Sequence, residues 1–404
     1  MKKSRRIFLK NILCGAFSAS LIPAGYLKGV HKTEQRIKKG PMFYRRLGRT
    51  NLSISEISLG GSPLPSWAVL LEAVNRGVNY IDTSESYQNG NSERQIGRLF
   101  KQIGREKVQV GTKFHLRRNW SEESILNSVH HSLRRLQTDY IDVLLIHGAS
   151  SAEQLTDERV LSALEKLKKE GKYRFRGLSC HRNHHEVVKK AVDCGYYDMI
   201  QLAFNVFDIQ EPKEETRLFD DYLGESGIRP LLKLASAHDM GIIAMKTLKV
   251  GGRKQNLEPY KTGETTIHQA MLKWVLENKN VSSAVIEMLS FGQLEEDLAA
   301  VGSVLSVQER QNLFRHVAEN SGHYCHLCGC CEEQCPQDIK TTSILHCLTY
   351  YESYHKRILA REAYSRLNPS QTAVSCQNCG RCEQACPYGV AVRDKIREAH
   401  SRLG

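Results

Sequence analysis

The distribution of cysteine constrains this chain more than any other feature of its sequence. The chain has 404 residues and 13 cysteines, and ten of the cysteines lie between Cys325 and Cys386. Eight of these ten form two runs with the same spacing, Cys-x2-Cys-x2-Cys-x3-Cys-Pro, which begin at Cys325 and at Cys376. A disulfide framework would be spread over the fold rather than confined to one end of the chain. The pattern therefore predicts a cysteine-built module at the C-terminus.

The spacing within each run is that of bacterial [4Fe–4S] proteins. In those proteins three close thiolates hold one cluster, and the fourth, which precedes a proline, usually binds the other cluster. We therefore expect two [4Fe–4S] clusters. The thiolates expected on the first cluster are those of Cys325, Cys328, Cys331 and Cys386. Those expected on the second cluster are Cys335, Cys376, Cys379 and Cys382.

Two cysteines of this region, Cys330 and Cys347, are left over by that assignment. Cys330 could replace its neighbour Cys331 as a cluster ligand. Zinc is a weaker interpretation of the same residues, because a zinc ribbon needs only two separated Cys-x-x-Cys pairs. It would leave the third cysteine of each run and the Cys-Pro steps unexplained.

The segment between the two runs, residues 336–375, is long and contains helical stretches at 343–354 and 356–367. A small β-hairpin ferredoxin would not need so long a connection. We therefore expect a small α-helical ferredoxin-like domain over residues 321–404, preceded by a connecting helix over residues 306–320.

Residues 1–30 are predicted to be an export signal. They contain six lysines and arginines and no acidic residue, and a short, weakly apolar run follows at 12–22. Residues 4–10, Ser-Arg-Arg-Ile-Phe-Leu-Lys, match the twin-arginine consensus. We expect recognition by the twin-arginine translocase, which carries folded proteins, and a periplasmic location. The cleavage sites are imperfect, so an uncleaved signal could attach the protein to the membrane. A polar linker over residues 31–42 would follow.

Composition argues against two classes of protein. The net charge is +13, but six of the positive charges lie in the predicted signal, and no dense basic stripe is interleaved with aromatic residues. Nucleic-acid binding is therefore not expected. No stretch approaches the roughly 18–20 apolar residues of a membrane-spanning helix, which excludes a polytopic membrane protein.

Residues 43–305 alternate short β-rich runs with longer segments of helical period. The eight predicted strands cover residues 56–59, 79–82, 108–113, 141–146, 174–179, 199–202, 241–245 and 283–286. Eight strand–helix units in about 250 residues predict an α/β fold, a closed (β/α)8 TIM barrel. A doubly wound sheet is less favoured, because Gly60-Gly61 after the first strand does not complete a phosphate-binding turn.

In such a barrel the chemistry gathers at the C-terminal ends of the strands. Asp82, Lys113 and His147 stand at the ends of three successive predicted strands, and Tyr87 lies in the loop after Asp82. Each residue alone has a structural interpretation: a core histidine, a solvated lysine or a helix-capping aspartate. Because all four would converge on one mouth, together they predict a catalytic site.

Over residues 43–305 the sequence resembles the aldo/keto reductase family. Residues 80–87, Tyr-Ile-Asp-Thr-Ser-Glu-Ser-Tyr, are similar to the family's D-T-A-x-x-Y signature, and Gly111-Thr-Lys113 and Leu144-Leu-Ile-His147 supply the rest of its catalytic tetrad. With the cysteine module, the chain resembles the iron–sulfur branch of the family. The resemblance implies interconversion of a carbonyl and an alcohol on a small molecule, with NADP(H) or NAD(H) exchanging a hydride.

The resemblance also implies a role for each member of the tetrad. Tyr87 would exchange a proton with the substrate oxygen. Lys113 would lower the pKa of Tyr87, and Asp82 would keep Lys113 charged and oriented. His147 would hydrogen-bond the substrate oxygen.

The residues implied on the cofactor side are Ser179, Gln201, Met245, Lys246, Ser290, Gln293 and Asp297. Three features depart from the family pattern. Met245 stands where many members have an aromatic residue, Cys180 stands where asparagine is usual, and residues 287–297 lack the usual Pro-Gly and basic residues. The identity of the nicotinamide, and whether it exchanges, are left open by these departures.

Three histidines, His181, His184 and His185, follow the fifth predicted strand. Neighbouring histidines on a helix face different ways and chelate a metal poorly. We expect these three residues in a solvated loop.

The function expected from these features is that of an exported iron–sulfur oxidoreductase of aldo/keto reductase type. Its two clusters would pass electrons to an unidentified redox partner. Free NADPH is scarce outside the cytoplasm, so a tightly held nicotinamide loaded before export would fit this location. Two alternatives stay open: an electron-transfer subunit with an inactive barrel, and a reductase whose clusters are purely structural.

Overall fold

The computed structural model describes residues 36–116, 120–181, 183–208, 228–248, 257–352 and 357–404. The predicted export signal lies outside the described residues, as does the first part of the predicted linker.

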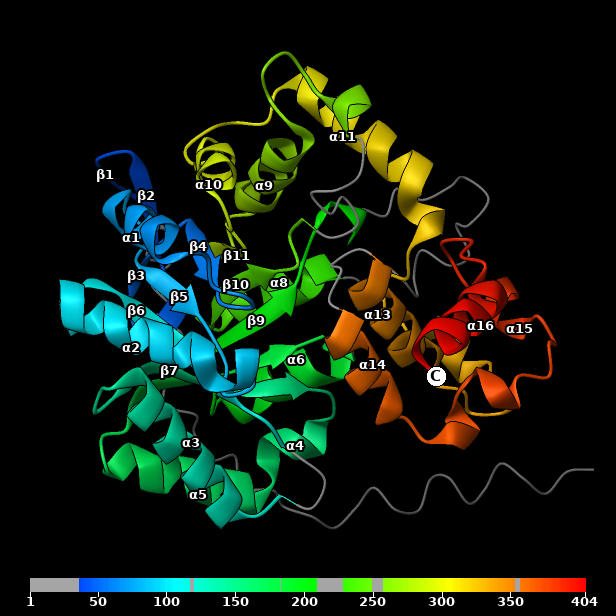
Figure 1. Cartoon of the computed structure of the whole chain (residues 1–404), viewed down its shortest axis with the longest axis horizontal. Coiled ribbons are helices and arrows are strands. Elements are labelled where there is room, and N and C mark those ends of the chain that lie inside the picture. The colour runs from blue at the N-terminus through cyan, green and yellow to red at the C-terminus, as the bar shows by residue number, and fades with distance from the viewer. Residues whose placement is uncertain (1–35, 117–119, 182, 209–227, 249–256, 353–356) are drawn as a thin grey trace, which may run out of the picture. The chain divides into compact units, whose positions relative to one another are not determined.

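Eight parallel strands close into a barrel in the order in which they follow along the chain, and Figure 1 shows helices around them. The strands are β4 (Ile57–Gly60), β5 (Tyr80–Asp82), β6 (Gln109–Phe114), β7 (Ile141–Ala149), β8 (Tyr173–Cys180), β9 (Met199–Ala203), β10 (Gly241–Met245) and β11 (Ser283–Ile286). The barrel closes where β11 pairs with β4, with Ile286 opposite Leu59. The predicted (β/α)8 fold is confirmed, and every predicted strand overlaps an observed one.

The strands are buried on both faces, as expected for a barrel whose outer face is covered by helices. Alternate residues such as Ile81 and Leu144 belong to the large core shared with the helices. A second cluster includes Val143 and Leu145 of β7 together with Leu47 and Ile54 from the N-terminal segment. Successive residues of one strand therefore point alternately to the barrel interior and to the layer between strands and helices, and apolar side chains fill both.

The helices associated with the barrel are α1 (Trp67–Asn75), α2 (Asn91–Ile103), α3 (Glu122–Leu136), α4 (Ala152–Thr156), α5 (Glu158–Lys169), α6 (His184–Cys194), α8 (Ile228–Ala237), α9 (Ile267–Glu277), α10 (Phe291–Leu298) and α11 (Val307–Asn320). Ser121 caps the start of α3, because its side chain accepts a hydrogen bond from the Ser124 amide. In α5, Val160, Leu164 and Leu167 are buried on one face.

A three-stranded antiparallel sheet, β1 (Ile37–Lys39), β2 (Met42–Arg46) and β3 (Ser53–Ser55), precedes the barrel. It begins inside the segment predicted to be a linker. All three residues of β1 are exposed, which explains why their composition is that of a linker. The turn that follows β2 lies at the N-terminal end of the barrel. There the Arg49 amide donates a hydrogen bond to the Asp239 carbonyl, just before β10, at 2.6 Å.

The C-terminal region is helical, as predicted. Its helices are α12 (Cys330–Glu333), α13 (Thr341–Glu352), α14 (Arg357–Ser365), α15 (Arg381–Gln384) and α16 (Val392–Leu403). Helix α13 packs against α14 and α16 around a core of its own that includes Ile344, Leu348 and Ile396. The barrel and these helices belong to one unit, Arg36–Gly404. Within the residues that the structure describes, no helix is both long enough and apolar enough to span a membrane.

Candidate active site and cysteine cavities

The barrel topology brings the four predicted catalytic residues together. Strands β5, β6 and β7 are neighbours in the barrel, so their C-terminal ends meet. Asp82 is the last residue of β5, Lys113 lies near the end of β6, and His147 lies near the end of β7. Tyr87 begins the short 3-10 helix Tyr87–Gly90 that follows β5.

Lys113 and Asp82 form a buried ion pair beneath Tyr87. Lys113 Nζ donates to Asp82 Oδ1 at 2.6 Å and to the Thr83 carbonyl at 2.7 Å. Burial raises the pKa of Asp82 and lowers the pKa of Lys113, and their mutual attraction opposes both shifts. Gln201 adds a hydrogen bond that stabilises the ionised Asp82. Moving either side chain away would leave the other as an uncompensated buried charge. The pair therefore holds both side chains in one position.

Tyr87 lies over this pair, with Lys113 Nζ 5.2 Å from the centroid of the Tyr87 ring. Burial raises the pKa of Tyr87 well above 10, and the negative charge of Asp82 raises it further. The overall shift of the Tyr87 pKa is therefore upward, and the implied lowering of this pKa by Lys113 stays a prediction. Tyr87 is protonated at neutral pH, which is the form needed to donate a proton.

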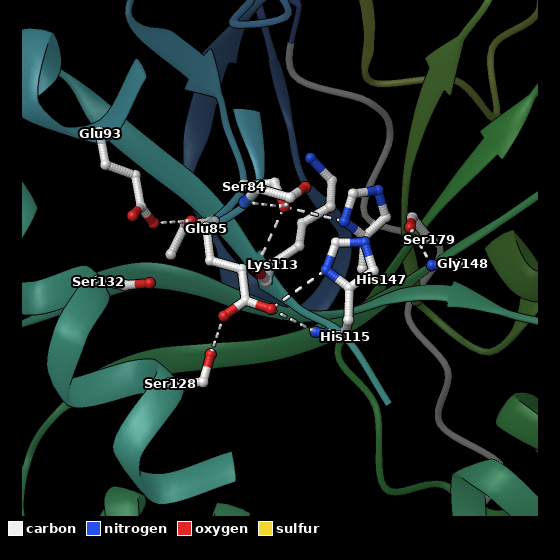
Figure 2. A network of polar contacts seen from close by, with 12 residues as sticks. Ser84, Glu85, Glu93, Lys113, His115, Ser128, Ser132, His147, Gly148 and Ser179 are labelled. Carbon is white, nitrogen blue, oxygen red and sulfur yellow. Dashed lines mark hydrogen bonds and ion pairs between the residues drawn. The ribbon is translucent and has the colours of Figure 1, made fainter. Parts of the chain in front are cut away.

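His147, on β7, lies beside the Tyr87 ring. Its ring is edge-on to the ring of Tyr87, with centroids 5.8 Å apart. Figure 2 shows the contact of His147 with Ser84, in which Nδ1 lies 2.9 Å from Ser84 Oγ. Burial lowers the pKa of His147 well below 6.5, so the imidazole is neutral. The β7–β8 register is irregular between Ile146 and Ala149, and such an irregularity redirects the side chains at that point. A neutral ring held through Nδ1 leaves Nε2 for a substrate oxygen.

Two residues of this site, Glu85 and His115, were not singled out from the sequence. The His115 amide donates to Glu85 Oε1 at 3.1 Å, and His115 Nδ1 lies 3.2 Å from the same oxygen (Figure 2). Burial alone would raise the pKa of Glu85, but hydrogen bonds from His115 and Ser128 outweigh it and lower the pKa to about 2. The His115 ring lies 4.0 Å from that of His147. The sequence does hold one signal for His115. It lies two positions after Lys113, and residues two apart in a strand point to the same face.

Glu93, which follows the D-T-A-x-x-Y-like segment, supports the site from beneath. Thr112 Oγ1 donates to Glu93 Oε1 at 2.6 Å, and Arg135 Nε donates to Glu93 Oε2 at 2.6 Å. Glu93 is fully buried. Its two bonds tie α2 to β6 and α3, and so fix the strand that carries Lys113.

The expectation of a solvated loop after the fifth barrel strand is wrong for His181. The His181 ring lies 6.4 Å from that of His147 and 6.1 Å from that of His346 in α13. Burial lowers the pKa of His181 well below 6.5, and the charge of Lys246 contributes. His181 follows β8 directly, so it lies at the C-terminal ends of the strands, whereas His185 is exposed in α6.

Two of the residues implied on the cofactor side, Ser179 and Gln201, lie opposite each other on β8 and β9. Ser179 Oγ accepts a hydrogen bond from the Gly148 amide at 2.9 Å. Gln201 Oε1 is buried and has no hydrogen-bond partner among the described residues. A buried carbonyl oxygen needs a donor, and the carboxamide of a nicotinamide would supply one. These residues therefore fit that end of the cofactor.

The other implied residues divide into two groups. Met245 is buried at the end of β10, and Lys246 follows it with a left-handed backbone (φ 56°) and its Nζ 2.6 Å from His346 Nε2. At the start of α10, Ser290 Oγ accepts from the Gln293 amide at 3.2 Å, and Gln293 Oε1 accepts from the Leu289 amide at 2.7 Å. Ser290 and Gln293 thus act as helix caps. The last implied residue, Asp297, is fully buried in α10.

The eight predicted cluster ligands surround two separate cavities. One is lined by Cys325, Cys328, Cys331 and Cys386. The other is lined by Cys335, Cys376, Cys379 and Cys382. This is the grouping that the spacing predicts, with the fourth cysteine of each run crossing to the other cavity. Cys331 lines its cavity and Cys330 does not.

The two runs repeat the same backbone geometry. Leu327 and Asn378 occupy equivalent positions and both have positive φ (60° and 58°), as do Gly329 and Gly380 (88° and 78°). These turns wrap each loop around its cavity. Among the described His, Cys, Asp and Glu residues, no group of three is arranged to hold a single metal ion. Thiolates spread around a cavity fit a multinuclear cluster better than one zinc ion, which gathers its sulfurs at about 2.3 Å.

Comparison with family models identifies two regions. Residues 65–317 match the aldo/keto reductase family, and residues 324–391 match a 4Fe-4S dicluster domain.

Among curated proteins, L-galactose dehydrogenase of Arabidopsis thaliana is 31% identical over 303 residues, which cover 68% of this chain and 92% of that protein. NADH-specific methylglyoxal reductase of Escherichia coli (strain K12) is 27% identical over 326 residues, which cover 68% of this chain and 97% of that protein. Among solved structures, an aldo-keto reductase from Bacillus halodurans in its holo form has a TM-score of 0.54 at 24% identity, covering 68% of this chain and 96% of that chain. An aldo-keto reductase from Klebsiella pneumoniae in complex with NADPH has a TM-score of 0.52 at 24% identity, covering 67% of this chain and 94% of that chain. The likeness to these structures shows the barrel fold.

Proposed function

Since the chain belongs to the aldo/keto reductase family and has a C-terminal 4Fe-4S dicluster domain, we propose that it interconverts a carbonyl and an alcohol on a small molecule and passes the electrons through two [4Fe–4S] clusters. The observation that carries the proposal is the geometry around Tyr87. A protonated phenol lies above a buried Lys113–Asp82 pair and beside a neutral His147.

In the reducing direction Tyr87 donates its proton to the substrate oxygen. His147 Nε2 donates a hydrogen bond to the same oxygen and holds it against Tyr87. As the phenolate forms, the nearby Lys113 ammonium stabilises the new negative charge, and Asp82 keeps that ammonium in place. In the oxidising direction the same groups act in reverse.

A nicotinamide bound at this site would supply or accept the hydride. Gln201 and Ser179 would hold its carboxamide, which the buried Gln201 Oε1 supports. Residues 287–297 contain no lysine or arginine to pair with a 2′-phosphate. This composition favours a nicotinamide bound through contacts other than a 2′-phosphate clamp.

The cluster domain would take single electrons from the barrel or return them. The eight cysteines form two groups of four around the two cavities, and each group would hold one cluster. The oxidation of one alcohol would place two electrons, as a hydride, on the bound nicotinamide. Reoxidation of that nicotinamide would release a proton and two electrons, and two clusters that accept one electron each have the capacity to take both. An external redox partner would then remove them.

Export through the twin-arginine pathway is part of the proposal. Its support is the heptapeptide at residues 4–10, together with a route that carries folded proteins and so suits clusters inserted before export. The protein would act in the periplasm, and an uncleaved signal would attach it to the membrane. Fractionation of cells making wild type and the double variant Arg5→Lys, Arg6→Lys tests this. A periplasmic variant would contradict it.

The substrate proposed is a small, oxygen-rich carbonyl or alcohol compound. The support is that relatives covering the barrel are named for L-galactose and for methylglyoxal. A screen of sugars, hydroxy acids and small aldehydes with anaerobically purified protein tests the activity. Turnover is followed with a one-electron dye, with and without added NADH or NADPH.

Three results are expected from that experiment. Metal analysis should give about eight iron atoms per chain. Dye reduction should depend on Tyr87, so that the variant Tyr87→Phe loses most of its activity. The EPR signals of the clusters should change during turnover. Activity that survives in Tyr87→Phe would favour an electron-transfer subunit, and clusters that never change redox state would favour a structural role.

A further inference from the structure

The two groups of cysteines differ in how closely they approach the barrel. Helix α13 touches the cavities of both groups. Its first residue, Thr341, lines the cavity of the second group, whereas Thr342 and Leu345 line the cavity of the first group. The first group is Cys325, Cys328, Cys331 and Cys386, and the second group is Cys335, Cys376, Cys379 and Cys382.

The residue of α13 that contacts the barrel lies beside the first cavity. His346 follows Leu345 directly, and its Nε2 lies 2.6 Å from Nζ of Lys246, the residue after β10. An α-helix rises about 1.5 Å per residue, so Thr341 lies roughly 7.5 Å before His346 along the helix axis. Along α13 the first cavity is therefore nearer to the barrel than the second.

A row of aromatic rings continues from His346 to the proton donor of the barrel. The centroid of the His346 ring lies 6.1 Å from that of His181, which lies 6.4 Å from that of His147. The His147 centroid in turn lies 5.8 Å from that of Tyr87. Aromatic rings that pack against each other have centroids about 4.5–7 Å apart. Packed side chains therefore connect the part of α13 beside the first cavity with the catalytic residues.

A second contact joins the first group to the barrel without α13. His326 lines the first cavity and stacks on Tyr388, another lining residue, with the ring centroids 3.5 Å apart. The His326 ring also lies 6.1 Å from that of Phe207. Phe207 is buried shortly after β9, the strand that carries Gln201. The loop of the first group therefore contacts the barrel close to the strand implied in nicotinamide binding.

The second cavity lies toward the solvent. Within the described part of the chain, the hydrogen bonds and ion pairs of its lining residues all lead to other residues of the cluster domain, as from Arg393 to Glu383. Gln377 and Cys379 of its lining are exposed, whereas Cys328 is the one exposed residue in the lining of the first cavity.

The two groups are adjacent to each other. Thr341 Oγ1, in the lining of the second cavity, lies 3.1 Å from Cys331 Sγ of the first group. Cys331 and Cys335 belong to one run, four positions apart, and line opposite cavities. The geometry thus gives a sequence of barrel, first group, second group and solvent.

We propose that the first group holds the cluster that exchanges electrons with the barrel, and that the second group holds the cluster that exchanges them with the external partner. The inference rests on the proposed function and adds the order of electron transfer to it. Electron transfer through a protein slows steeply as the distance grows. The group that contacts the barrel is therefore the first acceptor, and the group at the surface is the point of exit.

One turnover supplies two electrons to this route. Oxidation of the alcohol moves a hydride to the nicotinamide, while the hydroxyl proton goes to the Tyr87 phenolate. Reoxidation of the nicotinamide releases one proton and two electrons. The electrons pass one at a time through the first group to the second, and an external one-electron acceptor takes both.

The test uses two matched variants of the full chain, purified anaerobically. Cys328→Ala and Cys379→Ala each remove the second cysteine of one run, and both cysteines are exposed. Each variant should keep about half of the wild-type iron, because one cluster of two loses a ligand. Dithionite should reduce the remaining cluster of each variant, as seen by EPR. Cys330→Ser, which changes a cysteine that lines neither cavity, is the control and should behave like wild type.

The electron donors are NADH and L-galactose, added separately, and cytochrome c is the one-electron acceptor. EPR samples are frozen during turnover. Cys379→Ala should show the signal of its reduced first cluster and should reduce cytochrome c more slowly than wild type. Cys328→Ala should show no reduced cluster within the time in which wild type is reduced. An EPR redox titration of each variant checks that the potential of its remaining cluster matches that of the same cluster in wild type, so that a missing signal reports a missing route.

Two outcomes would overturn the inference and leave the proposed function intact. They are a reduced second cluster in Cys328→Ala within the wild-type time, and an oxidised first cluster in Cys379→Ala during turnover. If either variant does not accumulate, Cys325→Ala and Cys376→Ala repeat the comparison, since they remove the first cysteine of each run. Wild-type clusters that stay oxidised with both donors, while dithionite reduces them, would instead contradict the proposed function, and the order of transfer would fall with it.

Discussion

The two sites of this molecule are assembled in opposite ways. The cysteines around the two cavities come from two short runs, and the backbone turns the same way in both. The barrel site draws on the ends of β5, β6, β7, β8 and β10, and on α13 from beyond the barrel. Spacing within a run therefore predicts the partners of a cysteine, whereas only the closed fold determines the neighbours of Tyr87.

The difference also concerns electrostatics. The barrel site is a network of buried polar groups in which pairing and burial oppose each other, as at Lys113 and Asp82. The cavities are lined by thiols, by apolar residues such as Ile339 and Val390, and by a few polar residues such as Arg393 and His326. If each site depends on its own chemistry, changes in one should leave the other intact, except where α13 joins them.

The largest expected effect separates the two sites completely. Tyr87→Phe removes one hydroxyl, the proton donor, and should lower kcat by about 10² to 10⁴-fold, as loss of a general acid does. The phenyl ring keeps the packing, so iron content and the EPR spectrum of the reduced protein should equal those of wild type. A variant that loses iron would show that the barrel site and the clusters are coupled through stability.

The second prediction concerns a matched pair of neighbouring cysteines. Cys331 lines the first cavity and is buried, whereas Cys330 lies outside it. Cys331→Ser should lose about half of the iron, because one cluster of two loses a ligand. Cys330→Ser should retain all of it. The far-ultraviolet circular dichroism of both variants should keep the barrel signal, and equal iron in the two variants would contradict the assignment.

The barrel fold and the grouping of the cysteines around two cavities could be predicted because their signals are local. Eight alternating segments predict the barrel, and each run places three cysteines around one cavity while its fourth lines the other. The strand ends were less predictable. The prediction ended β7 at Ile146, whereas the strand continues to Ala149. The pairing with β8 is irregular between Ile146 and Ala149, so the regular alternation that a strand prediction needs stops at this point.

The missed features depend on contacts between distant segments. His181 belongs to the site because β8 ends beside β7, and no periodicity around His181 distinguishes it from a loop residue. The contact of Lys246 with His346 joins residues one hundred positions apart. Likewise, the exposed β1 is a strand only because β2 pairs with it, so its composition indicates a linker.

The third prediction tests the polar network of the barrel by pH. The pKa of Glu85 is lowered to about 2 from 4.5, so the ionised carboxylate stabilises the folded state. This contribution is fully present above the ordinary pKa and is lost as pH falls toward 2. Glu85→Gln should therefore lower the free energy of unfolding at pH 7 by up to about 3 kcal/mol. The difference from wild type should shrink as pH falls below about 4.5.

Denaturant unfolding followed by tryptophan fluorescence measures this difference at each pH. His115→Gln is the matched variant, since it retains a side-chain donor for Glu85 while removing the imidazole. A difference between wild type and Glu85→Gln that stays constant from pH 7 to pH 3 would contradict the proposed role of the ionised carboxylate.

The smallest expected effect lies in the barrel scaffold, away from both sites. Ser121 caps α3, accepting from the Ser124 amide at 3.1 Å, while Ser124 Oγ accepts from the Ser121 amide at 2.9 Å. Ser121→Ala should cost about 1 kcal/mol of barrel stability, because one amide at the helix start loses its partner. Ser121→Asp, which keeps an acceptor and places a negative charge at the helix N-terminus, should restore it. Helix α3 also carries Ser128 and Arg135, which hydrogen-bond Glu85 and Glu93. A lower kcat of Ser121→Ala under conditions where the variant is fully folded would show that the cap also positions the catalytic strand.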